Sequence, residues 1–329
     1  MSDRVAGATV AVIGFGNQGE AHALNLRGSG ADVIVGARPG HPAEAHAREL
    51  GFPTFALAEA ARRSTVVAML LPDEVVPTLW ASLAKELVPN VGMVFAHGFN
   101  LLYGALDFPA GADVVLVSPT GPGAVLKQVR DWGERLPAYL AVHRDGSSAA
   151  WDLAESYALR LSCWPLKRTT VREETEIDLF GEQAVLCGGM NALVVAAFET
   201  LVAEGYSPEI AYLECVHQLK YLADLLHERG MSGFRRAISG TALFGDLTRG
   251  PRVIGEASRR EMRAILGEIR SGAFAREWRA EVEGGRHWLE EAVGRAARHP
   301  IEPARERALA SGSSPDSGDP ESRNAMSKN

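Results

Sequence analysis

The chain has 329 residues, of which 46% are hydrophobic and 23% are charged, and its formal net charge is −7. This length and hydrophobic content favour two ordinary domains. The acidic balance argues against a nucleic acid as the main partner, because binding a polyanion depends on neutralising its phosphates with Lys and Arg. We therefore expect a small-molecule substrate.

The expected compartment follows from segments that the sequence lacks. No run of 18 or more apolar residues is present, and the first residues, MSDRVAGATV, have neither the basic nor the apolar region of a signal peptide. These features predict a cytoplasmic protein with no membrane partner.

Cys163, Cys187 and Cys215 lie far apart and form no Cys-x-x-Cys pair. We expect them to be reduced residues of the core.

In chain order, the first half alternates short β-rich runs with helical stretches, a pattern typical of a parallel sheet covered by helices. Strands are predicted at Thr9–Gly14, Asp32–Gly36, Val66–Leu71, Gly92–His97, Val114–Pro119 and Ala138–Val142. Helices are predicted at Gly19–Leu26, Ala43–Leu50, Leu57–Arg63 and Ala149–Leu161. We expect a right-handed, doubly wound α/β Rossmann domain over residues 1–170, with no strand after Val142.

The period of the sequence becomes helical from Glu173 onward. Long helices are predicted at Asp178–Glu204, Pro208–Glu228, Ala257–Ser271 and Phe274–Ala292. Such helices must bury their apolar stripes against one another or against a partner chain, so we expect an all-helical domain over residues 171–300. The later sequence is rich in Ser, Gly, Pro and Asp, which predicts a disordered tail over residues 301–329.

A glycine-rich loop follows the first predicted strand. The run VAVIGFGNQGEAHALNL places Gly14, Gly16 and Gly19 at the G-x-G-x-x-G spacing before a predicted helix, the context in which this spacing indicates dinucleotide binding. Gly14 permits the tight turn, Gly16 lets the backbone approach a pyrophosphate, and Gly19 allows close packing of helix on strand. A glycine-rich turn in an unrelated α/β domain would leave the flanking strand and helix unexplained. The predicted cofactor contacts are Gly14, Phe15, Gly16, Asn17, Gln18 and Gly19.

The end of the second predicted strand bears on the choice of cofactor. Arg38 stands where an NAD-specific site would carry Asp or Glu, and arginine suits a 2′-phosphate. The next residues, Gly40 to Glu44, offer no hydroxyl and no second cation besides His41, and Glu44 would repel a phosphate if it pointed inward. We predict NADPH and keep NADH as the alternative.

The helical half carries two pairs of polar residues spaced four apart. Asp178 and Glu182 lie in EETEIDLFGEQAVLCGG, and Glu214 and Gln218 lie in PEIAYLECVHQLKYL. Residues four apart share one helix face, and oxygen ligands from two helices are what one or two Mg²⁺ ions require. Acids on amphipathic helices more often form a solvated face. Here the neighbours are apolar, and buried charge would need a metal or a cation to offset it.

Together these segments resemble the ketol-acid reductoisomerases of branched-chain amino-acid biosynthesis, in their shorter class. The resemblance runs from about Val10 to Trp278 and rests on VAVIGFGNQGEAHALNL, LLPDE, FAHGFN, SPTGPG, EETEIDLFGEQAVLCGG, GYSPEIAYLEC, ISGTALFGD and GPRVI. It implies a Rossmann domain and a knotted or intertwined helical domain. It also implies a homodimer, or a multiple of it, with shared active sites.

The resemblance further implies a two-step reaction on acetohydroxy acids at one site. A Mg²⁺-dependent alkyl migration comes first, and hydride transfer from the nicotinamide to the new ketone follows. By resemblance, Asp178 bridges two Mg²⁺ ions, Glu182 is a ligand of the first, and Glu214 is a ligand or acid/base near the second. Ser239 holds the substrate carboxylate, and His97 belongs to the polar network beside the nicotinamide.

Two residues of the expected site depart from the family pattern. In SPTGPG, whose Gly123 is a predicted cofactor contact, Thr120 stands where the family has lysine. Gln218 stands where the family has a second glutamate. Threonine supplies neither the charge nor the reach of lysine, and glutamine cannot accept a proton at neutral pH and binds Mg²⁺ less strongly than a carboxylate. Losing one cation and one anion leaves the net charge of the site unchanged, which indicates adaptation.

Three functions follow from these residues. The first is an NAD(P)H-dependent reductase of a ketone, a 2-oxo acid or an imine, with the isomerase step weakened or lost. The second is an authentic Mg²⁺-dependent reductoisomerase that converts 2-acetolactate to 2,3-dihydroxyisovalerate. The third is a dinucleotide-binding pseudoenzyme. The two departures favour the first function, whereas the retained Asp178, Glu182, Glu214 and Ser239 argue for turnover.

Overall fold

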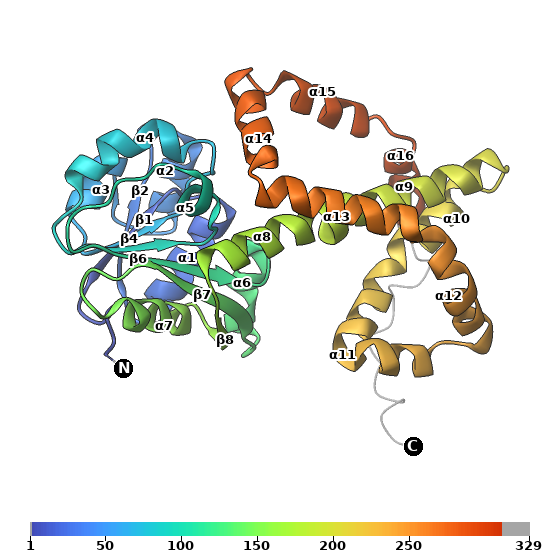
Figure 1. Cartoon of the computed structure of the whole chain (residues 1–329), viewed down its shortest axis with the longest axis horizontal. Helices are drawn as coiled ribbons and strands as arrows, with labels where there is room; N and C mark the ends of the chain where they lie inside the picture. The colour runs from blue at the N-terminus through green and yellow to red at the C-terminus, as the bar shows by residue number, and fades with distance from the viewer. Residues whose placement is uncertain (1, 311–329) are drawn as a thin grey trace, which may run out of the picture. The chain divides into compact units, whose positions relative to one another are not determined.

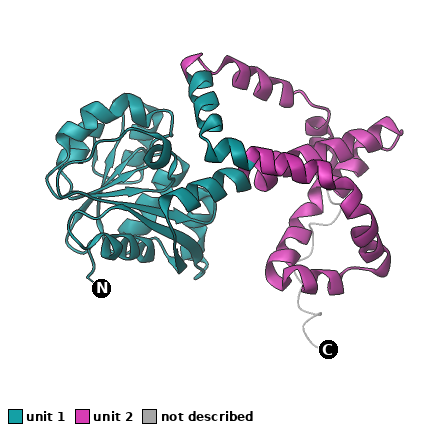
Figure 2. Cartoon of the chain, in the orientation of Figure 1, with its two compact units in different colours: residues 1–181, 266–282 teal, residues 182–265, 283–329 magenta. Residues whose placement is uncertain are grey.

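The computed structural model describes residues 2–310, which form two compact units (Figures 1 and 2). Unit 1 comprises residues 1–181 and 266–282, and unit 2 comprises residues 182–265 and 283–329. The division differs from the expected boundary at residue 170. The first turns of the helical half belong to the N-terminal unit, and a later segment returns to it.

Unit 1 is built on one sheet of eight strands in the order β3-β2-β1-β4-β5-β6-β7-β8. The strands are β1 (Thr9–Ile13), β2 (Asp32–Gly36), β3 (Thr54–Phe55), β4 (Val66–Met69), β5 (Gly92–Phe95), β6 (Asp113–Pro119), β7 (Leu136–Arg144) and β8 (Cys163–Arg168). The order reverses between β1 and β4, which is the switch point where doubly wound sheets bind ligands. The predicted Rossmann architecture is confirmed.

Two details of the sheet correct the sequence prediction. A strand does follow Val142, because β8 pairs with β7. It carries Pro165, Lys167 and Arg168, which are residues that edge strands tolerate, so it lacked the apolar run by which buried strands are found. The sheet is also not wholly parallel, since β6 and β7 are antiparallel.

Helices cover both faces of this sheet. They are α1 (Asn17–Gly28), α2 (Pro42–Glu49), α3 (Leu57–Arg62), α4 (Val76–Leu83), α5 (Phe99–Tyr103), α6 (Gly123–Asp131), α7 (Ala150–Arg160) and α8 (Val171–Gly181). The two faces of β1 enter different apolar clusters, Val10 and Val12 in one and Ala11 and Ile13 in the other. Because side chains alternate along a strand, this division is expected of a sheet that is buried on both sides.

His22 of α1 is fully buried in the first of these regions, with its Nδ1 3.0 Å from the Tyr157 hydroxyl. Burial lowers the pKa of His22 to about 3. Between about pH 6.5 and pH 3, His22 is therefore protonated in the unfolded chain and neutral in the folded protein.

We expect His22 to make the protein less stable as the pH falls through this window. The stability that depends on neutral His22 is fully present above pH 6.5, and the free energy of unfolding falls by about 1.4 kcal/mol per pH unit from there toward pH 3. Urea unfolding from pH 8 to pH 4.5 measures the free energy of unfolding as a function of pH. In a His22→Gln variant, the slope of this curve should correspond to the uptake of up to one proton fewer on unfolding. The same slope in both proteins would show that His22 is not the group responsible.

All the regular elements in the described residues of unit 2 are helices. Its elements include two π-helical turns, η2 (Glu182–Leu186) and η3 (Leu213–His217), with α9 (Gly188–Ala203), α10 (Pro208–Tyr212), α11 (Leu219–Ala237), α12 (Gly240–Val253), α15 (His287–Ala296) and α16 (Ile301–Leu309). Helix α13 (Glu256–Arg270) begins in unit 2 and ends in unit 1. Helix α14 (Ala273–Glu283) begins in unit 1, and its last residue belongs to unit 2. The predicted helical C-terminal domain is confirmed.

The expected disordered tail needs correction at its start. Residues 301–309 form α16, and its Ala304 is fully buried with Phe198, Ala211 and Tyr212. The Ser- and Gly-rich composition that suggested disorder begins only after this helix. The rest of the expected tail, residues 311–329, lies outside the described residues.

Many large apolar side chains of unit 2 are exposed within the chain. Leu186, Ile210 and Phe244 are 63%, 66% and 64% exposed. The helical run Val171–Ala203 is long and apolar enough to cross a membrane, by length and composition only, as the core helix of a soluble protein can also be. All three cysteines are free, as predicted, but Cys187 is exposed rather than part of the core.

Candidate active site

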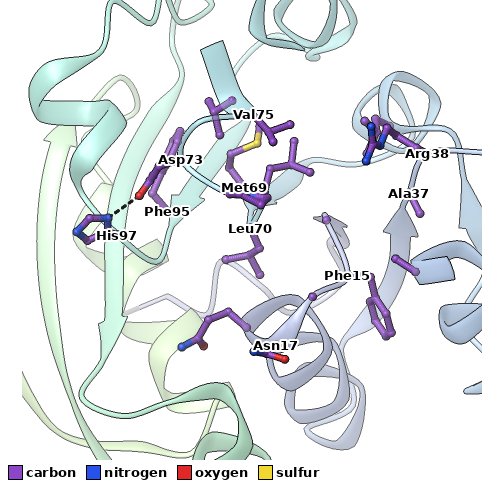
Figure 3. Close-up of a pocket in the computed structure, with 18 of the residues that line it drawn as sticks. Phe15, Asn17, Ala37, Arg38, Met69, Leu70, Asp73, Val75, Phe95 and His97 are labelled. Carbon is purple, nitrogen blue, oxygen red and sulfur yellow. Dashed lines mark hydrogen bonds and ion pairs between the residues drawn. The ribbon is translucent and has the colours of Figure 1, made fainter. Parts of the chain in front are cut away.

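A cavity of about 430 Å³ opens at the carboxyl ends of β1 and β4, at the switch point of the sheet (Figure 3). The predicted cofactor residues that line it are Gly14, Phe15, Gly16, Asn17, Gln18, Arg38 and His97. Arg38 lies toward one end of the cavity and His97 toward the other, with Met69 and Leu70 between them. The sequence-predicted loop and both outlying residues thus meet in one place.

The glycines of the loop are required by close packing. Gly14 has a φ of +97°, and a Cβ there would lie 2.7 Å from the Leu70 carbonyl oxygen. A Cβ at Gly19 would lie 2.1 Å from the Gly14 carbonyl oxygen, so α1 packs directly on the loop. Gly16, at the N-terminus of α1, has open space around its Cβ position and no side-chain cap. This opening and the free helix N–H groups suit a pyrophosphate.

Two of the predicted cofactor residues do not line the cavity. Gly19 packs α1 against the loop, as described above. A Cβ at Gly123 would lie 2.3 Å from the Asn17 carbonyl oxygen, so Gly123 allows α6 to support the glycine loop from behind. Both act by permitting close approach of backbone to backbone.

The charges at the Arg38 end favour an anion. Glu44 Oε2 accepts a hydrogen bond from the Gly40 N–H at 2.7 Å, and Glu44 Oε1 pairs with Arg48 at 2.7 Å. Both oxygens of the Glu44 carboxylate therefore bind groups of its own loop and helix. His41 Nδ1 accepts from the Ala43 N–H and caps α2. Among residues 2–310 no hydrogen bond or ion pair occupies the Arg38 guanidinium.

At the other end, His97 lies between two carboxylates. Its Nδ1 is 2.9 Å from Asp73 Oδ2, and its Nε2 is 3.1 Å from Asp178 Oδ2. The second contact is an ion pair by distance only, because the Nε2–H direction is not aligned with an acceptor in the described residues. Burial lowers the pKa of His97, but the carboxylates of Asp178 and Asp73 outweigh it and raise this pKa well above its usual value.

Glu174 is a site residue that the sequence analysis missed. It is fully buried beside Thr175, and its Oε1 has no hydrogen-bond partner within the described chain. Burial raises the pKa of Glu174 to about 7, while the charge of His97 and the Ser118 hydroxyl lower it less. A signal was present, because Glu174 precedes Asp178 by four residues, as Asp178 precedes Glu182.

The remaining predicted residues make local contacts. The Thr120 hydroxyl donates to the Pro137 carbonyl oxygen at 3.0 Å. In unit 2, the Gln218 side-chain amide donates to Glu214 Oε2 at 2.6 Å. Ser239 caps α12, where its Oγ accepts from the Ala242 N–H at 3.2 Å. Glu182 begins the π-helical turn η2.

The predicted magnesium ligands are divided between the units. Asp178 lies near the end of α8 in unit 1, and Glu182 and Glu214 belong to unit 2. In the described part of the chain, no group of three or more His, Cys, Asp or Glu side chains is gathered as a metal site. The donors are carboxylates, and Asp178 and Glu182 are spaced one helical turn apart, so their chemistry fits Mg²⁺.

Comparison with known proteins assigns the family. Residues 4–164 match the family profile described as acetohydroxy acid isomeroreductase, NADPH-binding domain, and residues 171–311 match the one described as ketol-acid reductoisomerase, C-terminal domain. The chain belongs to the ketol-acid reductoisomerase family. It is accordingly an NAD(P)H-dependent oxidoreductase, and its Rossmann unit binds a nicotinamide cofactor.

Two solved structures resemble this chain to different degrees. An NADH-preferring ketol-acid reductoisomerase from an uncultured archaeon is 33% identical, with a TM-score of 0.91 over 94% of this chain and 97% of that one. A semialdehyde dehydrogenase NAD-binding protein from Cupriavidus necator is 19% identical, with a TM-score of 0.61 over 80% of this chain and 99% of that one. The second likeness concerns the fold alone.

Proposed function

We propose that this ketol-acid reductoisomerase homologue reduces a ketone, a 2-oxo acid or an imine, with its isomerase step weakened or lost. The observation that carries the proposal is at Thr120. Its hydroxyl donates to the Pro137 carbonyl, so the position where the family has a lysine offers no cation. The dinucleotide cavity and the Asp73–His97 pair are meanwhile intact.

The residues of the chain divide the work of such a reduction. The glycine loop and the N-terminus of α1 bind the pyrophosphate, and Arg38 holds the adenosine end. His97, fixed by Asp73, offers Nε2 at the opposite end of the cavity. Asp178, Glu182 and Glu214 would hold Mg²⁺, and Ser239 would hold the substrate carboxylate. When bound, NAD(P)H supplies the hydride and Mg²⁺ polarises the substrate oxygens.

An authentic reductoisomerase that acts on 2-acetolactate is the second candidate. It is favoured by the retained Asp178, Glu182, Glu214 and Ser239, and by the 33% identity to a ketol-acid reductoisomerase over nearly the whole chain. In this case Gln218, bonded to Glu214, would serve as a neutral ligand or as a support for one.

One experiment separates these functions. The pure protein is mixed with Mg²⁺ and NADPH or NADH, first with 2-acetolactate and then with a pre-isomerised 3-hydroxy-2-oxo acid, and the absorbance of the reduced cofactor is followed. We expect oxidation of the cofactor with the pre-isomerised substrate alone. Equal turnover of both substrates would establish the authentic reductoisomerase, and cofactor binding without any turnover would indicate a pseudoenzyme.

We further propose NADPH as the preferred cofactor, and Arg38 tests it. Arg38→Glu should weaken NADPH binding by about 1–3 kcal/mol, the usual cost of a lost charged hydrogen bond, and should affect NADH less. Fluorescence titration with both cofactors measures the two dissociation constants. Arg135→Glu, an exposed change outside the cavity, is the matched control. Equal losses for NADPH and NADH would place Arg38 away from a 2′-phosphate.

We also propose that the enzyme is a cytoplasmic homodimer, or a multiple of one. The exposed Leu186, Ile210 and Phe244 lie on helices of unit 2, and extensive exposed apolar surface marks protein interfaces. Sedimentation at micromolar concentration should therefore give a dimer or a larger even assembly. A monomer with full activity would contradict the shared active site.

A further inference from the structure

Asp73 and His97 are brought together by the topology of the sheet. Asp73 lies in the loop after β4, and His97 lies directly beyond β5. These strands are parallel neighbours, so their carboxyl ends meet at the edge where the cofactor cavity opens. Figure 3 shows the two side chains facing each other there, joined by their hydrogen bond.

Asn100 holds Asp73 by two contacts. Its Nδ2 donates to the Asp73 carbonyl oxygen at 3.0 Å and to Asp73 Oδ1 at 2.9 Å. Asn100 is 1% exposed, so the amide has little freedom to turn. A flipped amide would set its oxygen against the Asp73 carbonyl oxygen, which can only accept. The orientation of Asn100 is therefore fixed by the backbone of Asp73.

With Oδ1 bound to Asn100, Asp73 presents Oδ2 to His97 Nδ1 at 2.9 Å. An ionised carboxylate only accepts hydrogen bonds, so Nδ1 carries hydrogen in the charged ring and keeps it when the ring becomes neutral. The ring of Phe99 is stacked on the imidazole at a centroid distance of 6.3 Å and an interplanar angle of 21°. The hydrogen bond and the stacking together leave the imidazole one orientation.

We propose that Asp73, clamped by Asn100, is a positioning residue that fixes the tautomer and orientation of His97, so that Nε2 alone faces the reacting groups. Nε2 is suited to this because it has no aligned hydrogen-bond acceptor among the described residues, although Asp178 lies 3.1 Å away. Asp73, His97 and Asn100 all line the cavity that the glycine loop also lines. The inference rests on the proposed function, because it assigns His97 a place beside the nicotinamide.

An Asp73→Asn variant tests the clamp, because Asn100 dictates how the introduced amide turns. Asn100 Nδ2 remains a donor, so the oxygen of the introduced amide should face Asn100 and its NH₂ group should face His97 Nδ1. A donor against Nδ1 forces the hydrogen of the neutral ring to Nε2. The substitution is nearly isosteric, yet it should reverse the tautomer.

The tautomer is read by long-range ¹H–¹⁵N correlation spectra of the full chain labelled with ¹⁵N-histidine, with His97→Gln to assign the signal. The spectra are recorded at a pH high enough for the ring to be neutral, because a charged imidazolium carries hydrogen on both nitrogens. We expect hydrogen on Nδ1 in the unmodified protein and on Nε2 in Asp73→Asn. The exposed Asp107→Asn should leave the spectrum unchanged. Hydrogen on Nε2 in the unmodified protein would overturn the proposal, whether or not the variant folds and whether or not any substrate is turned over.

Kinetics supply the second readout. With the pre-isomerised substrate and NADPH, Asp73→Asn should lower kcat at least about tenfold, while the dissociation constant of NADPH stays within about twofold, because correct protonation of an acid/base group contributes mainly to the chemical step. An unchanged kcat alongside a reversed tautomer would overturn the positioning role. Absence of turnover in the unmodified protein would instead refute the proposed function and leave the tautomer result standing.

Discussion

Restoring lysine and glutamate together, in a Thr120→Lys/Gln218→Glu variant, should raise turnover of 2-acetolactate about tenfold or more above either single variant. By family resemblance the two residues belong to one proton and metal network, and such residues are coupled by about 0.5–3 kcal/mol. Lysine alone adds a cation that lacks its paired anion. Glutamate alone places a carboxylate where Gln218 now donates to Glu214, so two like charges would meet.

The comparison needs all four proteins and both substrates. Steady-state rates with 2-acetolactate should be lowest in the single variants and highest in the double variant. Rates with the pre-isomerised substrate should change less, because hydride transfer depends on placement of the nicotinamide. Additive effects would mean that the two positions act independently, and efficient conversion of 2-acetolactate by the unmodified protein would make both departures neutral.

Gly98→Ala should lower both the stability and the activity of the protein, because it adds a methyl group where side chains of α8 already lie. A Cβ at Gly98 would lie 1.9 Å from Thr175 Oγ1 and 3.2 Å from Glu174 Oε2. The backbone of Gly98 is unstrained, with a φ of −89°, so the conflict is one of space alone. Overpacking of this kind costs about 1–3 kcal/mol, and a displacement of α8 that shifts Asp178 from His97 should lower activity about a hundredfold.

Thermal or urea unfolding and steady-state kinetics measure the two effects of Gly98→Ala. The matched background is Thr175→Ala, which removes the nearest atom and also the hydrogen bond to the Val171 carbonyl oxygen. In that background the added methyl group should cost much less than in the unmodified protein. An equal cost in both backgrounds would mean that Thr175 is not what excludes a side chain at position 98.

The fold was largely predictable because local patterns agree with it. The alternation of buried strands and amphipathic helices predicted the strands of the sheet that carry apolar runs. The two strands that escaped prediction have physical reasons: β3 has two residues, and β8 is a polar edge with Pro165 and Lys167. Similarly, α16 follows a Pro and ends at a low-complexity stretch, and it is stabilised by tertiary burial of Ala304.

The residues of the site could be predicted where their role depends on the local conformation of the backbone. The glycine loop has a required geometry, so its spacing was enough to place Gly14, Gly16 and Arg38 at one cavity. Asp73, Asn100 and Glu174 were missed because their roles arise from contacts between distant segments. Nothing in the residues next to Asn100 signals that its amide bonds to Asp73, since β4, β5 and α5 meet only in the folded sheet.

Unit 1 is built from two separate stretches of sequence, which affects how it can fold while the chain is being synthesised. All eight strands are encoded by residue 168, so the sheet can pair before unit 2 has been synthesised. The segment 266–282 comes later and supplies the Ile269 carbonyl that accepts from the Tyr103 hydroxyl, and the Arg279 guanidinium that donates to the Tyr103 carbonyl. Until that segment arrives, the nascent Rossmann unit is missing part of its own surface. A fragment cut at the end of α8 would keep the nucleotide cavity but would be trapped in this incomplete state.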